Sequence, residues 1–95
     1  MQDTLFSFHT DPGHGWFEVS VKQFQSLGLC LSQISSFSYC SPDGKTLYLE
    51  EDCDAGVFVG KYNDQYGKYP EYKVWYEEDS FIRDLPNTHT SMLMS

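Results

Sequence analysis

The alternation of apolar and polar residues predicts strands near the start of the chain. Residues 4–10 place Phe6 and Phe8 on one face, and residues 16–21 repeat the same two-residue period. The intervening sequence DPGHG is rich in turn formers, because proline presets one backbone angle and glycine accepts unusual ones. Together these features predict an antiparallel hairpin.

A short helix and a second hairpin are expected next. Ser20 and Gln23 have the spacing of a capping box, and Gly28 can end the helix that they begin. The sequence SPDGK then predicts a tight turn within residues 34–51. The two arms around this turn alternate, with Phe37 and Tyr39 in one arm and Leu47 and Leu49 in the other.

The period then changes to that of a helix. Apolar residues recur at the i, i+3, i+4 and i+7 positions of an amphipathic helix, namely Ala55, Phe58, Val59 and Tyr62. Asp52 is expected to be the N-cap. Gly56 and Gly60 weaken this helix relative to alanine, and a close approach of the helix to a sheet would explain them.

The last third of the chain predicts one more strand. Residues 71–78 alternate, with one face formed by Tyr72, Val74 and Tyr76, and residues 79–85 add a helical turn. Residues 87–95 show no pattern and are expected to form a flexible tail, which leaves a single domain over residues 1–86. The order β-β-α-β-β-α-β predicts a small α+β domain, with an antiparallel sheet of about five strands and two short helices on one face.

Composition narrows the classes of function. The 95 residues carry a formal net charge of −8, so the surface repels phosphates, and direct binding to nucleic acid or to an anionic membrane is not expected. The acidity suits a basic protein partner, or serves solubility alone. Three cysteines without a C-x-x-C spacing argue against a disulfide framework and a cysteine-based zinc site. The chain has no apolar leader, so a reducing cytoplasm is expected.

The turn sequence DPGHG raises the question of a metal. His9, Asp11 and His14 are metal-ligating residue types, and the string resembles the zinc-histidine loop of N-acetylmuramoyl-alanine amidases. Those enzymes need a further glutamate and a distant histidine on a much longer domain. The favoured interpretation is therefore structural: Asp11 caps the turn, His14 lies in solvent, and Trp16 packs across the strand pair.

Residues 49–56, LEEDCDAG, concentrate four carboxylates. The spacing does not match a calcium-binding loop, which alternates its acids before a glycine. Two interpretations stay open, an acidic start to the helix and an acidic patch that faces a partner. Cys53 lies among these acids, which would raise its pKa and weaken it as a nucleophile.

Aromatic residues are the other concentration. On the last strand Trp75 lies on the face opposite Tyr72, Val74 and Tyr76. If that second face of the sheet is open, Trp75 and Trp16 are exposed beside acids, which is the composition of an interface hot spot. The alternative is that the rings fill both faces of a small core.

Two motifs together carry a resemblance. DPGHGWFEV and YLEEDCDAGVF, with the Ile-Arg of SFIRDL, resemble a group of small uncharacterised proteins carried by bacteriophages and mobile elements. No activity is assigned to that group, so it implies no catalytic residue. Phage accessory proteins of this size and acidity often disable host enzymes by binding them, which is an association and not a mechanism.

The leading hypothesis is a non-enzymatic, phage-type inhibitor of a host defence protein, possibly a CRISPR component, that works in the cytoplasm of a bacterial host without a cofactor or metal. Its acids and aromatic rings would block a nucleic-acid site of that protein. The predicted partner-binding residues are Glu50, Glu51, Asp54, Trp75, Glu77, Glu78, Asp79 and Trp16.

Two further hypotheses remain. The first is a homo-oligomeric sponge that sequesters a nucleotide-derived immune signal by aromatic stacking, with cations drawn from Lys61, Lys68, Lys73 and Arg83. The second is a metal-dependent enzyme built on His9, Asp11 and His14.

Overall fold

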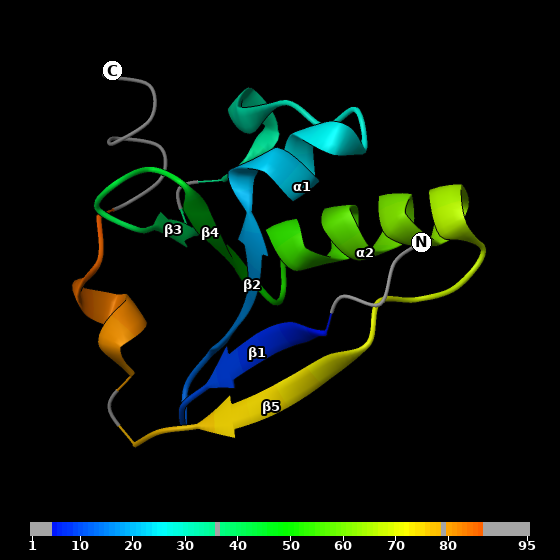
Figure 1. Cartoon of the computed structure of the whole chain (residues 1–95). Coiled ribbons are helices and arrows are strands. Elements are labelled where there is room, and N and C mark those ends of the chain that lie inside the picture. Colours follow the sequence, from blue (N-terminus) through cyan, green and yellow to red (C-terminus); the bar gives the residue numbers. More distant parts are fainter. Residues whose placement is uncertain (1–4, 36, 79, 87–95) are drawn as a thin grey trace.

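A twisted five-stranded sheet forms the middle layer of the molecule (Figure 1). The computed structural model describes residues 5–35, 37–78 and 80–86. The strand order is β3-β4-β2-β1-β5, and the parallel pair is β1 with β5, whereas the other neighbours are antiparallel. The strands are β1 (Phe6–Thr10), β2 (Gly15–Ser20), β3 (Tyr39–Cys40), β4 (Thr46–Glu50) and β5 (Tyr72–Tyr76). The predicted α+β fold with about five strands is confirmed, with one parallel pair in the sheet.

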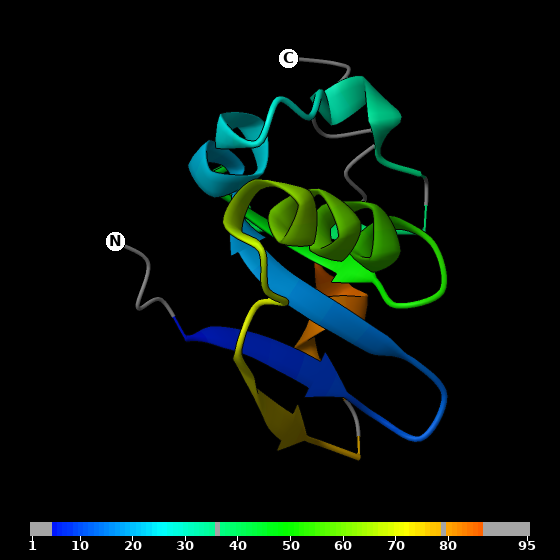
Figure 2. The ribbon, with the colours of Figure 1, turned by 90° about the vertical axis from the view of Figure 1, so that its right-hand side faces the viewer.

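The helices divide between the two sides of the sheet. Both α-helices lie on one side, as predicted, and a short 3₁₀ helix lies on the other side (Figures 1 and 2). The helical elements are α1 (Val21–Ser26), η1 (Leu31–Gln33), α2 (Asp54–Tyr66) and η2 (Phe81–Asp84). We call the α1–α2 side the helix face of the sheet and the η2 side the second face.

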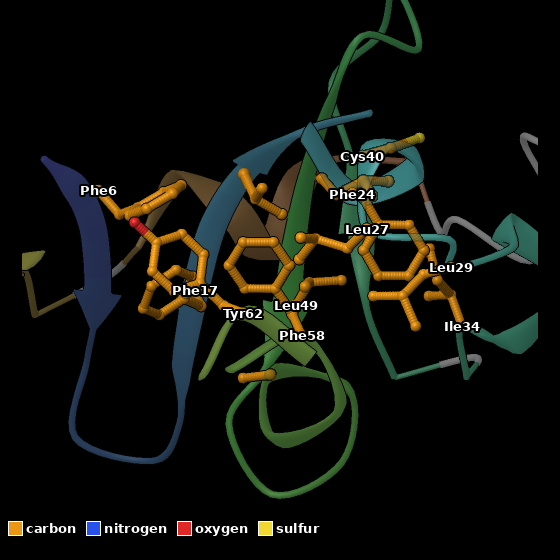
Figure 3. Close-up of a cluster of buried hydrophobic side chains, with 13 residues drawn as sticks. Phe6, Phe17, Phe24, Leu27, Leu29, Ile34, Cys40, Leu49, Phe58 and Tyr62 are labelled. Carbon is orange, nitrogen blue, oxygen red and sulfur yellow. The ribbon is translucent and has the colours of Figure 1, made fainter. Parts of the chain in front are cut away.

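The main core fills the space between the helix face and the two α-helices (Figure 3). Phe17 from β2 meets Phe58 from α2 with ring centroids 5.6 Å apart, and Phe24 from α1 stacks on Phe58 at 6.5 Å. Burial of large aromatic side chains supplies much apolar area per residue, which a chain of this length needs. Most of these residues are ones that the sequence pattern predicts, including Phe6, Val19, Leu47, Leu49, Ala55 and Tyr62. The core also contains Leu29, Ile34 and Cys40, which the pattern does not predict.

The second face has a smaller core of its own. Ile82 of η2 is fully buried against Trp16 of β2 and Tyr48 of β4. Ser80 caps η2, since its side chain accepts a hydrogen bond from the Ile82 N–H at 3.3 Å. The C-terminal segment thus closes the part of the second face that lies over β2 and β4.

The predicted local signals hold at the first helix and at the second turn, whereas neither Gly13 nor Gly15 takes a positive φ in the first turn. The Ser20 side chain accepts from the Gln23 N–H at 3.0 Å, and the Gln23 side chain accepts from the Ser20 N–H at 3.2 Å. Gly28 follows α1 with φ +83°, and Gly44 takes φ +74° in the second turn. Glycine is suited to both positions because a Cβ is strained in this region.

Three local expectations about the second hairpin and α2 are wrong. The N-cap of α2 is Cys53 and not Asp52, and the Cys53 side chain makes no capping hydrogen bond. Asp52 lies in the turn before the helix, where its N–H donates to the Glu50 side chain at 2.9 Å. Gly56 faces open space, as does Gly60, so no close approach to the sheet explains them. Phe37 lies outside β3 and is exposed, because β3 begins only at Tyr39.

Among the described residues, no helix has the length and apolar character needed to cross a membrane. The tail expected over residues 87–95 lies outside the described residues.

Candidate functional site

The structure brings the two sequence motifs and the Ile-Arg of SFIRDL together at one end of the sheet. The β1–β2 turn, the segment between β4 and α2, and η2 all line one pocket of about 330 Å³. Its lining residues are His14, Trp16, Phe37, Tyr39, Glu50, Asp52, Cys53 and Arg83. We call it the Trp16 pocket.

Asp11 anchors this end of the molecule. It accepts from the N–H groups of Gly13 and His14, each at 2.9 Å, which is the predicted turn-capping role. Its two oxygens also meet the Arg83 guanidinium at 2.6 and 3.0 Å. Hydrogen bonding to Arg83, and then to the turn N–H groups, holds the pKa of the Asp11 carboxyl far below its usual range.

Glu50 is a structural residue, which corrects its assignment to a partner surface. It is 6% exposed, because β4 carries it onto the second face beside the β1–β2 turn. One oxygen accepts from the Asp52 N–H at 2.9 Å, and the other lies 3.4 Å from His14 Nδ1. His14 itself is half-exposed, in agreement with the interpretation that it lies in solvent.

Trp16 is also buried, at 2% exposed, so it is not an exposed anchor. Ile82 and Tyr48 cover its ring, and the Arg83 guanidinium lies 5.3 Å from the ring centroid. Among the described residues, the indole Nε1 has no hydrogen-bond partner. A buried N–H without an acceptor is rare and costs about 1–3 kcal/mol, so this atom is a point at which an acceptor would be favoured.

Asp54 holds the fold together and is likewise unavailable to a partner. It is 5% exposed. Its carboxylate accepts from the Ser35 N–H at 3.0 Å, from the Ser35 hydroxyl at 2.7 Å and from the Ser38 hydroxyl. These bonds tie the segment before β3 to the first turn of α2, where a negative charge is also favoured by the helix dipole.

The Cys53 thiol is poorly suited to act as a nucleophile. Cys53 is exposed, but partial desolvation by neighbouring atoms raises the pKa of its thiol first, and the charges of Glu50 and Asp54 raise it further. A thiol with a raised pKa carries little thiolate near neutral pH, and thiolate is the reactive form. This agrees with the expectation drawn from the acidic sequence around it.

The three residues of the metal hypothesis are engaged separately. His9 Nε2 lies 2.6 Å from Glu18, Asp11 binds Arg83, and His14 faces Glu50. The Arg83 charge beside Asp11 also opposes a cation there. Within the part of the chain that the structure describes, no three such side chains are placed to hold a metal ion.

The other predicted partner residues lie along β5, an edge strand of the sheet. Every residue of β5 is exposed, and Trp75 is 46% exposed. Its indole N–H donates to the Ser7 hydroxyl at 3.3 Å, and Lys73 Nζ lies 4.5 Å above its ring. We call residues 71–78, with their exposed acids Glu71, Glu77 and Glu78, the edge surface.

Glu51 is the remaining exposed member of the predicted set. It lies beside an apolar pocket of about 410 Å³ between α2 and the β1–β5 edge, with Phe8, Val59 and Tyr72 among the lining residues. Asp79 lies outside the described residues. The predicted set therefore divides into a buried group, with Trp16 and Glu50 at the Trp16 pocket and Asp54 at the start of α2, and an exposed group near β5.

Arg83 is the site residue whose role the sequence did not indicate. The sequence places Arg83 in a motif and offers its charge to a nucleotide, whereas the structure pairs it with Asp11. A signal existed, since Arg83 is one of only six basic residues and the buried turn acid needs a counter-charge.

No family model, no curated protein and no solved structure matches this chain.

Proposed function

We propose that this protein is a non-enzymatic binding protein that places its edge surface on a basic surface of another protein. The observation that carries the proposal is β5, a strand exposed along its whole length with aromatic side chains on both faces. The free outer edge of such a strand is a template for association unless charge or a covering element protects it. Here the flanking charges are acids, which favour a basic partner.

The exposed aromatic residues and acids have different roles in such an interface. Trp75 and Tyr76 offer large rigid areas of the kind that dominates binding free energy. Glu77 and Glu78 lie at the end of β5 and would steer the encounter with a basic groove. Because the same acids repel phosphate, the protein would compete with nucleic acid for that groove without binding nucleic acid itself.

In the biological setting that the phage resemblance implies, the partner is a host defence protein, and this protein is its inhibitor in the bacterial cytoplasm. Blocking a nucleic-acid groove disables a CRISPR-type or nuclease effector without any catalysis by the inhibitor. The raised pKa of Cys53 and the separate engagement of His9, Asp11 and His14 support a non-catalytic assignment.

The test uses matched surface variants in a capture experiment from bacterial lysate. W75A/E77Q removes one exposed ring and one carboxylate from the edge surface, and F37A/D64N removes the same two groups elsewhere. We expect the parent and F37A/D64N to retain one nucleic-acid-binding protein, and W75A/E77Q to lose it. Raising salt from about 0.1 M to about 1 M shortens the screening length from ~10 to ~3 Å and should release the partner.

Duplex DNA added as a competitor should also displace the captured protein from the parent. Equal capture by the two variants, or capture unaffected by DNA, would refute the proposed mode of binding.

The unpartnered Trp16 Nε1 favours a second candidate, a small-molecule site in the Trp16 pocket. The Nε1 atom is buried, so a ligand acceptor atom would satisfy this N–H after neighbouring side chains move aside, and the aromatic walls would pack on a flat ring. Glu50 and Asp52 line the same pocket and repel phosphate. The ligand expected under the sponge hypothesis is therefore a nucleobase or a nucleoside, and not a nucleotide.

Calorimetry with nucleosides and with the matching nucleotides separates the two ligand classes. We expect heat from a nucleoside, weaker binding by its phosphate ester, and loss of binding in W16F, which removes the N–H and keeps a ring. No heat from the nucleoside panel would eliminate this candidate.

A further inference from the structure

The backbone of β5 has one free side, and its residues alternate in direction. The Phe6 N–H donates to the Glu71 carbonyl, and the Glu77 N–H donates to the Thr10 carbonyl, each at 2.9 Å. Both bonds use odd-numbered residues of the β5 segment. Because backbone groups alternate along a strand, Lys73 and Trp75 also direct theirs toward β1, whereas Tyr72, Val74 and Tyr76 direct theirs outward.

A second strand added to this edge must pair with those outward groups. In an antiparallel pair, the residues that exchange both hydrogen bonds stand opposite each other. Two copies of the chain related by a two-fold axis pair their β5 strands antiparallel, and even-numbered residues must then meet even-numbered residues. The two-fold axis therefore lies where a residue of one copy stands opposite the same residue of the other copy. Three such registers lie at the centre of the strand, with the axis at Lys73, Val74 or Trp75.

Side-chain charge distinguishes these registers. With the axis at Lys73, the two lysines stand opposite each other. With the axis at Val74, Glu71 of one copy stands opposite Glu77 of the other, again like charges. With the axis at Trp75, Lys73 of each copy stands opposite Glu77 of the other, which gives two ion pairs of opposite charge.

The Trp75 register also suits the aromatic residues. Trp75 meets Trp75 of the second copy at a pair without mutual hydrogen bonds, where side chains approach most closely. On the helix face, Val74 meets Tyr76 of the second copy. All of these side chains are exposed in the single chain, so the pairing would cover apolar area that the fold leaves in water.

We infer that, without another partner, this protein forms a symmetric dimer in which β5 pairs antiparallel with β5 of a second copy, with the two-fold axis at Trp75. The sheet then continues across both chains as ten strands. The inference is independent of the proposed function. It adds one consequence, because a β5 strand engaged in the dimer has no free edge to offer to a basic partner.

Cysteine cross-linking tests the register. In a C30S/C53S background, which removes the two exposed native thiols, W75C places its thiols at the close pair on the axis and should form a covalent dimer under mild oxidation. V74C is the matched control, since its nearest partner across the interface is Tyr76. Equal or faster cross-linking of V74C would overturn the Trp75 register.

Charge reversal tests the ion pairs. K73E replaces both attractive pairs by repulsive ones and should weaken dimerisation about tenfold or more in sedimentation equilibrium, and E77K should do the same. The double variant K73E/E77K restores both pairs with reversed sign and should dimerise like the parent. Thermal melts of the variants at low concentration show that the monomer still folds.

A parent protein that stays monomeric at high concentration would overturn the inference, and so would a double variant as weak as the single ones. Failure of the lysate capture leaves these expectations unchanged, since dimerisation needs only the purified chain.

Discussion

Arg83 and Asp11 stand 72 residues apart in the sequence and form a two-bond ion pair, with nitrogen–oxygen distances of 2.6 and 3.0 Å. The pair joins η2 to the turn between β1 and β2. Through it, the C-terminal segment is fixed over Trp16, and Ile82 is held in the small core of the second face. A paired guanidinium in this position combines charge with a planar two-point geometry that lysine does not have.

The first prediction concerns acid stability. Asp11 has a lower pKa in the folded chain than the value of about 3.9 expected in the unfolded chain, so its contribution to stability is complete above that value. The contribution is lost as pH falls below about 4 toward the folded-state pKa. Urea unfolding of the parent and D11N should differ most at neutral pH, and the difference should shrink in acid. A difference that does not change with pH would contradict this role.

The second prediction concerns Gly15, which ends the first turn. A Cβ at this position would lie 2.2 Å from a Glu51 oxygen and 2.4 Å from the Phe8 ring. We expect G15A to lower the free energy of unfolding by about 1–3 kcal/mol, the usual cost of overpacking.

Gly56 is the matched control for that change, since a Cβ there meets nothing within 4 Å. G56A should raise stability by up to about 1 kcal/mol, because alanine favours the helix. If G15A melts at the same temperature as the parent, the Phe8 ring does not pack tightly against Gly15, and the prediction is wrong.

The third prediction separates the two tryptophans. W16A removes a side chain that is 2% exposed and should cost about 3–5 kcal/mol in chemical denaturation. W75A removes a half-exposed side chain and should cost about 1 kcal/mol or less in the monomer. Similar losses for the two variants would show that the second face is not closed as described.

The fourth prediction separates two adjacent acids. E50A leaves the Asp52 N–H without its acceptor and should cost about 1–3 kcal/mol of stability. E51Q changes an exposed carboxylate and should stay within about 0.5 kcal/mol of the parent. Thermal melts of the two variants side by side provide the check, and a destabilised E51Q would contradict the assignment.

A fifth prediction concerns salt. Each chain carries a formal charge of −8, so two copies repel each other over the whole surface. Screening should therefore strengthen the proposed dimer, while it weakens binding to a basic partner. Sedimentation at low and high salt measures the first effect, and a dimer that dissociates in high salt would show that screening of the Lys73–Glu77 pairs outweighs relief of the net repulsion.

The local elements could be predicted because their signals are local. The two-residue period at Phe6 and Phe8 predicted β1, and the Ser20–Gln23 spacing predicted the start of α1. The four apolar positions from Ala55 to Tyr62 predicted α2 and the face that it buries. In each case one short stretch of sequence contains both the pattern and its physical cause.

The second face could not be predicted, because its cover comes from the far end of the chain. The alternation around Trp16 shows that its side chain leaves the helix face but not what meets it there. The answer depends on Ile82 and Arg83, and no local pattern couples them to β2. For the same reason, exposed acids were expected at Glu50 and Asp54, where neighbours distant in sequence bury them.

The parallel pairing of β1 with β5 has a consequence for how the chain acquires its structure. The β1–β2 and β3–β4 hairpins involve nearby residues, whereas Phe6 pairs with Tyr72 near the other end of the described chain. Closing so long a loop costs chain entropy before any contact compensates for it, so β5 is expected to join late. During synthesis β1 is therefore the edge of the growing sheet until β5 has been made and has paired with it. Over that interval the free edge of β1 is open to pairing with other strands, which is a route to misassembly that ends when β5 covers it.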